Sequence, residues 1–312
     1  MKRFLSSCDC LPRIGFAVGV ALLLGSLAVS RPAVAEQLYM ACQGGSGGWQ
    51  SWDTQTGQYS LGSGISAGSL TVVSSGTFVY STDIPNRRIA LSSTDGSLIN
   101  ASFITPSGGA DALTISGNTL YSVGGSGVVS TWDATTGASI NANLVSGLNA
   151  AFAMLVSGSS LYVGEIGGSN ISQWNAATGQ VINSSFITGF APFGLASSGT
   201  RLFASNLNAS TVGVFDLATG SVIDASFITG LPSPKGLAVS GSTLYVASCD
   251  TGSYIGTYNA TTGAAINSQY MIINAAPNGL FIAPVPEPST CVMALAGLAC
   301  GGYSLFRRRR AR

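Results

Sequence analysis

The sequence contains no histidine, and only 8% of its 312 residues are charged. The absence of histidine removes the commonest general base and the commonest metal ligand. Basic residues are also scarce in the body of the chain: between residues 36 and 284, four bases face ten acids, a net charge of −6. DNA- and RNA-binding proteins need a basic surface, so we expect no nucleic-acid partner.

What the chain has in abundance is glycine, with 41 residues, and a hydrophobic fraction of 46%. Many Ser, Thr and Asn residues separate short groups of Val, Ile and Leu. This composition is typical of an all-β protein with many turns.

The first 35 residues predict a signal peptide. The basic segment "MKRFLSSCDCLPR" (1–13) precedes the apolar run "IGFAVGVALLLGSLAV" (14–29), and "AVA" (33–35) supplies the small residues that signal peptidase prefers before Glu36. An uncleaved membrane anchor is the alternative. Either interpretation predicts an exported body.

The last 28 residues predict a membrane segment. After "VPEPST" (285–290) come sixteen uncharged residues (291–306) and then an arginine cluster. A helix of that length covers about 24 Å, and snorkelling arginines close most of the gap to a ~30 Å hydrocarbon core. The arginines predict a cytoplasmic end. A buried core helix is the alternative.

The order of triplet, apolar segment and arginines resembles the PEP-CTERM sorting signal of bacterial exported proteins. The resemblance implies recognition by an exosortase-type processing enzyme, with transient anchoring in the inner membrane before transfer to the cell surface or exterior. The matching residues are Pro286, Glu287, Pro288, Arg307, Arg308, Arg309 and Arg310.

Between the two ends the chain repeats itself. Six motifs share one pattern, in which five of the six have an aromatic residue followed by Asp or Asn, and all six end in glycine. They are "WDTQTG" (52–57), "LSSTDG" (91–96), "WDATTG" (132–137), "WNAATG" (174–179), "FDLATG" (215–220) and "YNATTG" (258–263). A second motif, such as "SLYVG" (160–164), and a third, such as "FGLASSG" (193–199), follow the same period of about 41 residues.

Each repeat predicts four short strands, which is the pattern of a β-propeller blade. The first repeat lacks an innermost strand, and "APNGLFIAP" (276–284) resembles the innermost strands of later repeats. We therefore predict six blades closed by N- and C-terminal strands, with 1–35 as signal peptide, 36–284 as propeller and 285–312 as sorting signal. The repeats resemble NHL and gluconolactonase-type propellers. The repeated aromatics are expected to pack between blades, with a carbohydrate-stacking role as second choice.

A ligand site in such a propeller is expected at the channel mouth. The residues expected just before the innermost strands are mixed and mostly not acidic: Gly68, Asp111, Phe152, Phe193, Lys235 and Asn278. A calcium site needs several converging oxygen ligands, and the candidates Asp111, Glu165 and Asp250 occupy different positions in their repeats. We therefore predict no metal, no cofactor and no catalytic residue.

The predicted function is that of a non-catalytic, surface-displayed scaffold that binds extracellular polysaccharide or protein. The alternative is a secreted lactonase or hydrolase of the six-bladed type. A convergent set of Glu, Asn and Asp at one mouth would favour the enzyme, and an apolar or Ser/Gly-lined mouth would favour the scaffold.

Two cysteines, Cys42 and Cys249, remain in the exported body, in the first and sixth repeats. An oxidising exterior permits a disulfide, but equivalent positions in neighbouring blades lie near 10 Å apart, beyond the ~7 Å Cα limit for bridging. Two separate thiols in loops are the favoured interpretation. The two Cα atoms are expected within about 15 Å of each other.

Overall fold

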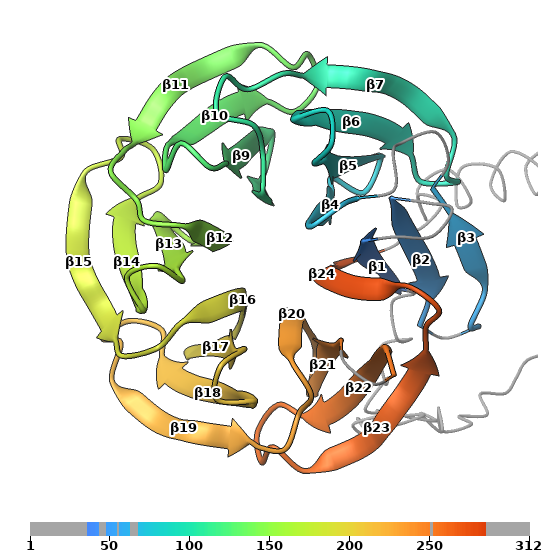
Figure 1. Cartoon of the computed structure of the whole chain (residues 1–312), viewed down its shortest axis with the longest axis vertical. Helices are drawn as coiled ribbons and strands as arrows, with labels where there is room; N and C mark the ends of the chain where they lie inside the picture. Colours follow the sequence, from blue (N-terminus) through green and yellow to red (C-terminus); the bar gives the residue numbers. More distant parts are fainter. Residues whose placement is uncertain (1–35, 44–47, 55, 63–67, 250–251, 285–312) are drawn as a thin grey trace, which may run out of the picture. The chain divides into compact units, whose positions relative to one another are not determined.

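The computed structural model describes residues 36–43, 48–54, 56–62, 68–249 and 252–284. These residues form six four-stranded antiparallel sheets arranged as blades around a central channel (Figure 1). No helix occurs among them, so none of them forms a helical segment able to cross a membrane. The predicted all-β, six-bladed propeller is confirmed, whereas the predicted signal peptide and transmembrane helix lie outside the described residues.

Each blade runs from an innermost to an outermost strand. Blades 1 to 3 are, in that order, β24 (Ala276–Pro284), β1 (Glu36–Gln43), β2 (Trp49–Asp53) and β3 (Tyr59–Leu61); β4 (Val72–Ser74), β5 (Phe78–Asp83), β6 (Arg88–Ser93) and β7 (Leu98–Ile104); and β8 (Ala112–Ser116), β9 (Thr119–Val123), β10 (Val129–Asp133) and β11 (Ser139–Val145).

The order is the same in the other three blades. Blades 4 to 6 are β12 (Ala151–Ser157), β13 (Ser160–Glu165), β14 (Asn170–Asn175) and β15 (Val181–Thr188); β16 (Pro192–Ser198), β17 (Arg201–Asn206), β18 (Thr211–Asp216) and β19 (Val222–Ile228); and β20 (Pro234–Ser240), β21 (Thr243–Ser248), β22 (Tyr254–Asn259) and β23 (Ala265–Ile272).

The ring closes as predicted. The last strand, β24, pairs with the first strand, β1, from Glu36 opposite Pro284 to Gln43 opposite Ala276. Leu280 lies opposite Met40 inside this sheet. The pairing with β24 provides hydrogen-bond partners for backbone groups along an edge of β1 that would otherwise be unpaired.

Turn chemistry explains why five of the six glycine-ended motifs share an Asp or Asn after their aromatic residue. In blade 3, the Asp133 carboxylate accepts hydrogen bonds from the backbone N–H groups of Thr135 and Thr136, and Gly137 takes a φ of 72°. Asn175, Asp216 and their counterparts make the same turn in other blades. The repeated residues therefore set the hairpin between the third and fourth strands.

The hydrophobic core is divided among the six interfaces between blades. Six clusters of buried side chains exist among the described residues, and each joins two neighbouring blades. Phe215 and Tyr258 are buried in two of them, and Trp52, Trp132 and Trp174 pack against three others. The prediction that the repeated aromatics pack between blades is confirmed.

A tyrosine on the second strand adds a polar link at three successive interfaces. The hydroxyls of Tyr80, Tyr121 and Tyr162 each donate to a backbone carbonyl in the next blade's turn, at 2.6, 3.1 and 2.7 Å. Blade 5 has Phe203 at this position, and Arg201 donates instead to the carbonyl of Ala260. The tyrosine of the second repeated motif, as in "SLYVG" (160–164), thus has a structural role that the sequence alone did not reveal.

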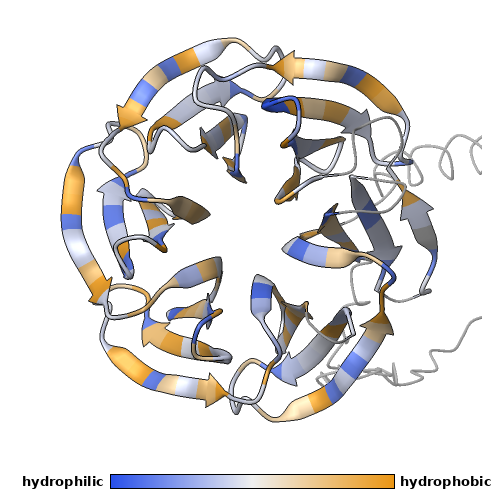
Figure 2. Cartoon of the chain, viewed as in Figure 1, coloured by the Kyte–Doolittle hydropathy of each residue, from blue (hydrophilic) through white to orange (hydrophobic). Residues whose placement is uncertain are grey.

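The outermost strands keep apolar residues in contact with solvent (Figure 2). Five isoleucines there are between 50% and 59% exposed: Ile99, Ile140, Ile182, Ile223 and Ile266. Each lies between two residues that are paired with the third strand, so it is the extra residue of a β-bulge. Bulges bend an edge strand and hinder pairing with another chain.

Candidate functional site at the mouth of the channel

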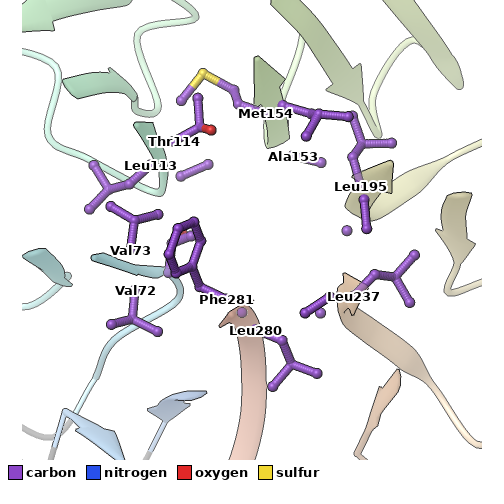
Figure 3. A pocket seen from close by; sticks show the side chains of 18 of the residues that line it. Val72, Val73, Leu113, Thr114, Ala153, Met154, Leu195, Leu237, Leu280 and Phe281 are labelled. Carbon is purple, nitrogen blue, oxygen red and sulfur yellow. The ribbon is translucent and has the colours of Figure 1, made fainter. Parts of the chain in front are cut away.

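The six innermost strands enclose a cavity of about 200 Å³. Its lining is mainly apolar, with only a few Thr, Ser and Asn residues among Leu, Val, Ala, Met and Phe. Figure 3 shows Val73, Met154 and Leu237, from three different blades, spaced around the opening. We call the end of the channel where the innermost strands begin the mouth, and the opposite end of the propeller the tail face.

Glycines let neighbouring innermost strands approach closely near the mouth. A Cβ on Gly236 would lie 2.2 Å from the carbonyl oxygen of Asn278, and one on Gly194 would lie 2.2 Å from that of Lys235. Both neighbours are backbone atoms, which cannot move aside as a flexible side chain can. Gly194 and Gly236 belong to the segments "PFGL" (192–195) and "PKGL" (234–237), which share the motif P-x-G-L. The glycine of this motif is therefore required by the spacing of blades 5, 6 and 1.

One half of the mouth carries a continuous row of side chains from blades 4, 5, 6 and 1. The rings of Phe152 and Phe193 stack with centroids 5.8 Å apart and planes 14° apart. The ammonium of Lys235 lies 5.4 Å from the centroid of Phe193 and donates to Oδ1 of Asn278 at 2.8 Å. We call these four residues the mouth row. All except the buried Asn278 are only partly buried, so they can contact a ligand.

Asn278 also connects the row to blade 2, because its Nδ2 donates to the carbonyl of Ser69 at 3.4 Å. The hydroxyl of Ser205 fixes the base of the lysine by donating to its carbonyl at 2.6 Å. These bonds hold the lysine and the asparagine in place before any ligand arrives.

The other half of the mouth, over blades 2 and 3, is different. The carbonyl of Asp111 accepts a hydrogen bond from Thr71 Oγ1 at 2.8 Å, while its carboxyl group is partly buried. Burial raises the pKa of this carboxyl group, and the nearby Arg87 guanidinium acts in the opposite direction. Arg87 itself donates to the carbonyl of Gly108 at 3.0 Å.

Of the predicted acidic candidates, only Asp111 and Glu165 lie among the described residues, and the two have different neighbours. The Glu165 carboxylate accepts from Asn149 N, Asn170 Nδ2 and Ser172 Oγ, which holds the loop at the end of β13. Asp250 lies outside the described residues. Within the described ranges no three Cys, Asp or Glu side chains form a group that could hold a metal ion.

The residues noted from sequence occupy slightly different places from those expected. Phe152, Phe193 and Lys235 are the second residues of their strands and Asn278 the third of β24, whereas only Asp111 directly precedes its strand. The innermost strands begin earlier because their first residues already pair with the second strand, as Ala151 does with Glu165. Sequence reasoning identified the four positions but not their association.

The two cysteines are free thiols, one of them in an unexpected place. Cys42 lies within β1 and is buried, because its pairing with Pro277 extends the strand beyond "LYMA". The prediction that it lies in a loop was wrong. Burial raises the pKa of its thiol to about 12.

Blades 1 and 6, which carry Cys42 and Cys249, are neighbours, as predicted. Cys42 belongs to the same buried cluster as Ala247, two residues before Cys249. The 15 Å separation itself stays a prediction. The sorting residues Pro286 to Pro288 and Arg307 to Arg310 lie outside the described residues.

The fold and the channel define the class of protein: a six-bladed β-propeller with an apolar channel. Residues 40–269 match the family described as outer membrane protein assembly factor BamB, and because the match spans most of the chain, the chain belongs to this family. Residues 284–310 match the PEP-CTERM protein-sorting motif. The protein is therefore exported and carries a signal that is processed by exosortase.

Solved structures show the same fold. The propeller in the crystal structure of a nidogen/laminin complex is 14% identical, with a TM-score of 0.65 over 80% of this chain and 99% of that chain. The computationally designed Ika8 protein is 15% identical, with a TM-score of 0.52 over 80% and 91%. These neighbours are compatible with the NHL-type resemblance. No curated protein matches the sequence.

Proposed function

We propose that this exported propeller is a non-catalytic scaffold that binds an acidic extracellular polysaccharide at the mouth of its channel. Before processing, the C-terminal segment anchors it in the inner membrane, and afterwards it acts at the cell surface or outside the cell. The observation that carries the proposal is the mouth row, in which Phe152, Phe193 and Lys235 adjoin one another at an opening.

The chemistry of the row suits an acidic sugar polymer. Aromatic rings offer rigid apolar surface that can contact the C–H face of a sugar ring at little entropic cost. An ammonium beside them attracts a uronate carboxylate or a sulfate. This attraction is local, because residues 36–284 carry a net charge of −6. The site therefore suits single acidic groups along a sugar chain rather than the dense charge of a nucleic acid. The hydrogen bonds from Lys235 to Asn278 and from Ser205 to the lysine carbonyl orient this charge in advance, and preorganisation of this kind reduces the cost of binding.

The non-catalytic part of the proposal is supported by the largely apolar side chains that line the channel and by the hydrogen bonds that engage the Glu165 carboxylate in a loop. A lactonase of this fold would need oxygen ligands that converge on one cation. Asp111 is partly buried at the mouth, but its described neighbours include the cationic Arg87 rather than further carboxylates.

A protein partner is the second candidate. The family is described by its role in outer membrane protein assembly, and the similar propeller of known structure comes from a complex of two proteins. Both facts concern similar proteins rather than this chain. They favour testing proteins as well as polysaccharides as binding partners.

The test is binding of the purified exported protein to an array of acidic and neutral polysaccharides, with surface proteins of the same bacterium in parallel. We expect binding to acidic polymers that weakens with added salt and falls about tenfold in Lys235→Met, a loss of ~1.4 kcal/mol for one charged contact. Binding to surface proteins alone, or equal binding by Lys235→Met, would contradict the proposal.

A further inference from the structure

The tail face is the side of the propeller from which both ends of the described chain leave. Glu36, the first described residue, lies opposite Pro284, the last, in the sheet of blade 1. β24 therefore runs from the mouth, where Asn278 lies, to the tail face, over about 20 Å at ~3.4 Å per residue.

The sorting motif follows the fold without a spacer. Its match begins at residue 284, which is also the final residue of β24. From Pro284 to Pro288 the chain spans at most about 14 Å in any conformation, because a residue extends it by no more than ~3.6 Å. An enzyme that encloses the triplet Pro286–Pro288 must bring its own surface to that distance from the tail face.

The end of β24 is held firmly in place. Ala283 is buried and pairs with Gln37. The backbone N–H and hydroxyl of Thr54, in the turn of blade 1, donate to the carbonyl of Glu36. The hydroxyl of Ser240, the last residue of β20 in blade 6, donates to the Glu36 carboxylate. Unpairing the end of β24 to lengthen the tail would break its pairing with β1 and expose Ala283, while the contacts of Glu36 hold the end of β1 against which β24 pairs.

From this geometry we infer that the turns of blades 1 and 6 beside the exit of the tail form a docking surface for the exosortase-type enzyme that processes this chain. The surface comprises Thr54, which follows β2, and the turn between β20 and β21. The inference rests on the sorting motif and the strand end, and is independent of what binds at the mouth.

The test uses a bulky substitution on the surface and a matched control. Ser242 is an exposed turn residue in blade 6, and its carbonyl accepts from Ala260 N; Ser159 occupies the same position in blade 4, exposed, with its carbonyl accepting from Ala176 N. Ser242→Arg therefore changes the tail face beside the exit, and Ser159→Arg changes it on the far side of the ring.

The measurement is the rate at which the full-length precursor loses its tail in a pulse–chase experiment in the producing bacterium. Each substitution is made with and without ten Gly/Ser residues inserted between Pro284 and Val285. We expect Ser242→Arg to slow processing about fivefold, the scale of one disturbed interface contact. Ser159→Arg should process at the wild-type rate, and the spacer should abolish the effect of Ser242→Arg.

Three results would overturn the inference. The first is wild-type processing of Ser242→Arg without the spacer. The second is equal slowing by Ser242→Arg with and without the spacer, and the third is equal slowing by both arginine variants, since the arginine would then act through folding. Protease resistance of the exported protein provides an independent measure of folding.

Discussion

The interfaces between blades and the mouth of the channel follow opposite rules. At the interfaces the same residue types recur: Tyr80, Tyr121 and Tyr162 make one bond three times. At the mouth, equivalent places in successive blades hold Asp111, Phe152, Phe193, Lys235 and Asn278, whose chemistries mostly differ. Residue types repeat where they pack between blades, because every blade makes the same kind of contact with its neighbour. A ligand that meets all blades at one opening needs no such repetition.

Opening the ring of blades should cause the largest loss of stability. Replacing β24 with a Gly/Ser segment, with the sorting motif kept, removes the inner partner of β1 and the packing of Leu280 in blade 1. The lost contacts rival the whole ~5–15 kcal/mol of a typical domain, so cooperative thermal unfolding should disappear. The same replacement in the three-residue β3, at the outer edge, should preserve it. Cooperative unfolding without β24 would show that closure is not essential.

A smaller effect is expected from Gly236→Ala. The added methyl group would overlap the carbonyl oxygen of Asn278, and we expect a loss of about 2–3 kcal/mol in urea unfolding, the range of overpacking in a dense interior. The control is Gly252→Ala, where a Cβ meets nothing within 4 Å. Equal stability of the two variants would refute the close-approach explanation of the "P-x-G-L" glycine.

Removing one tyrosine hydroxyl should lower the free energy of unfolding by less than Gly236→Ala does. In Tyr162→Phe the carbonyl of Leu217 loses its side-chain donor, at an expected cost of about 1 kcal/mol in the free energy of unfolding. Tyr80→Phe and Tyr121→Phe should behave alike, because their bonds are equivalent. If all three variants unfold at the wild-type urea concentration, the link between blades contributes nothing.

The smallest effect concerns pH. Hydrogen bonds from Thr136 hold the pKa of Asp133 below its usual value, and those from Thr219 do the same for Asp216. A lowered folded-state pKa contributes stability that is complete above the unfolded pKa of ~3.9 and is lost as pH falls through the folded value. The test is the double variant Asp133→Asn, Asp216→Asn. It should keep both turns, because Asn175 and Asn259 already accept the same turn hydrogen bonds in blades 4 and 6.

The double asparagine variant should therefore melt slightly below the wild type at pH 7 and approach it at pH 3. Both carboxylates are exposed, so the difference should be small at any pH. A gap that widens on acidification would mean that the carboxylates are not stabilised by their turns.

The blades were predictable because their signals are local. A "T-G" turn needs its own Asp or Asn and its own glycine, and β-strand periodicity lies within a few residues. Closure was also predictable, since "APNGLFIAP" matches the innermost strands of blades 5 and 6 while blade 1 lacks one.

The mouth row was not predictable, because it depends on distances between blades. Phe152 and Phe193 come from different repeats, and the angle between successive blades decides whether their rings stack or stand apart. The tyrosine bonds were missed for a similar reason: the tyrosine of the second repeated motif is visible, but its acceptor lies about 55 residues further along the chain. Cys42 was misplaced because the strand continues past a bulge between Met40 and Cys42.

The most direct test of the central claim compares one variant from each region. Phe152→Leu with Phe193→Leu removes the stack but retains apolar bulk, and Tyr162→Phe changes an interface. Melting temperature and affinity for an acidic polysaccharide are measured for both. The account predicts that the leucine variant loses about tenfold in affinity, or ~1.4 kcal/mol, with little change in melting temperature, while Tyr162→Phe melts lower and binds normally. Full affinity in the leucine variant, or parallel losses of both properties in both proteins, would contradict it.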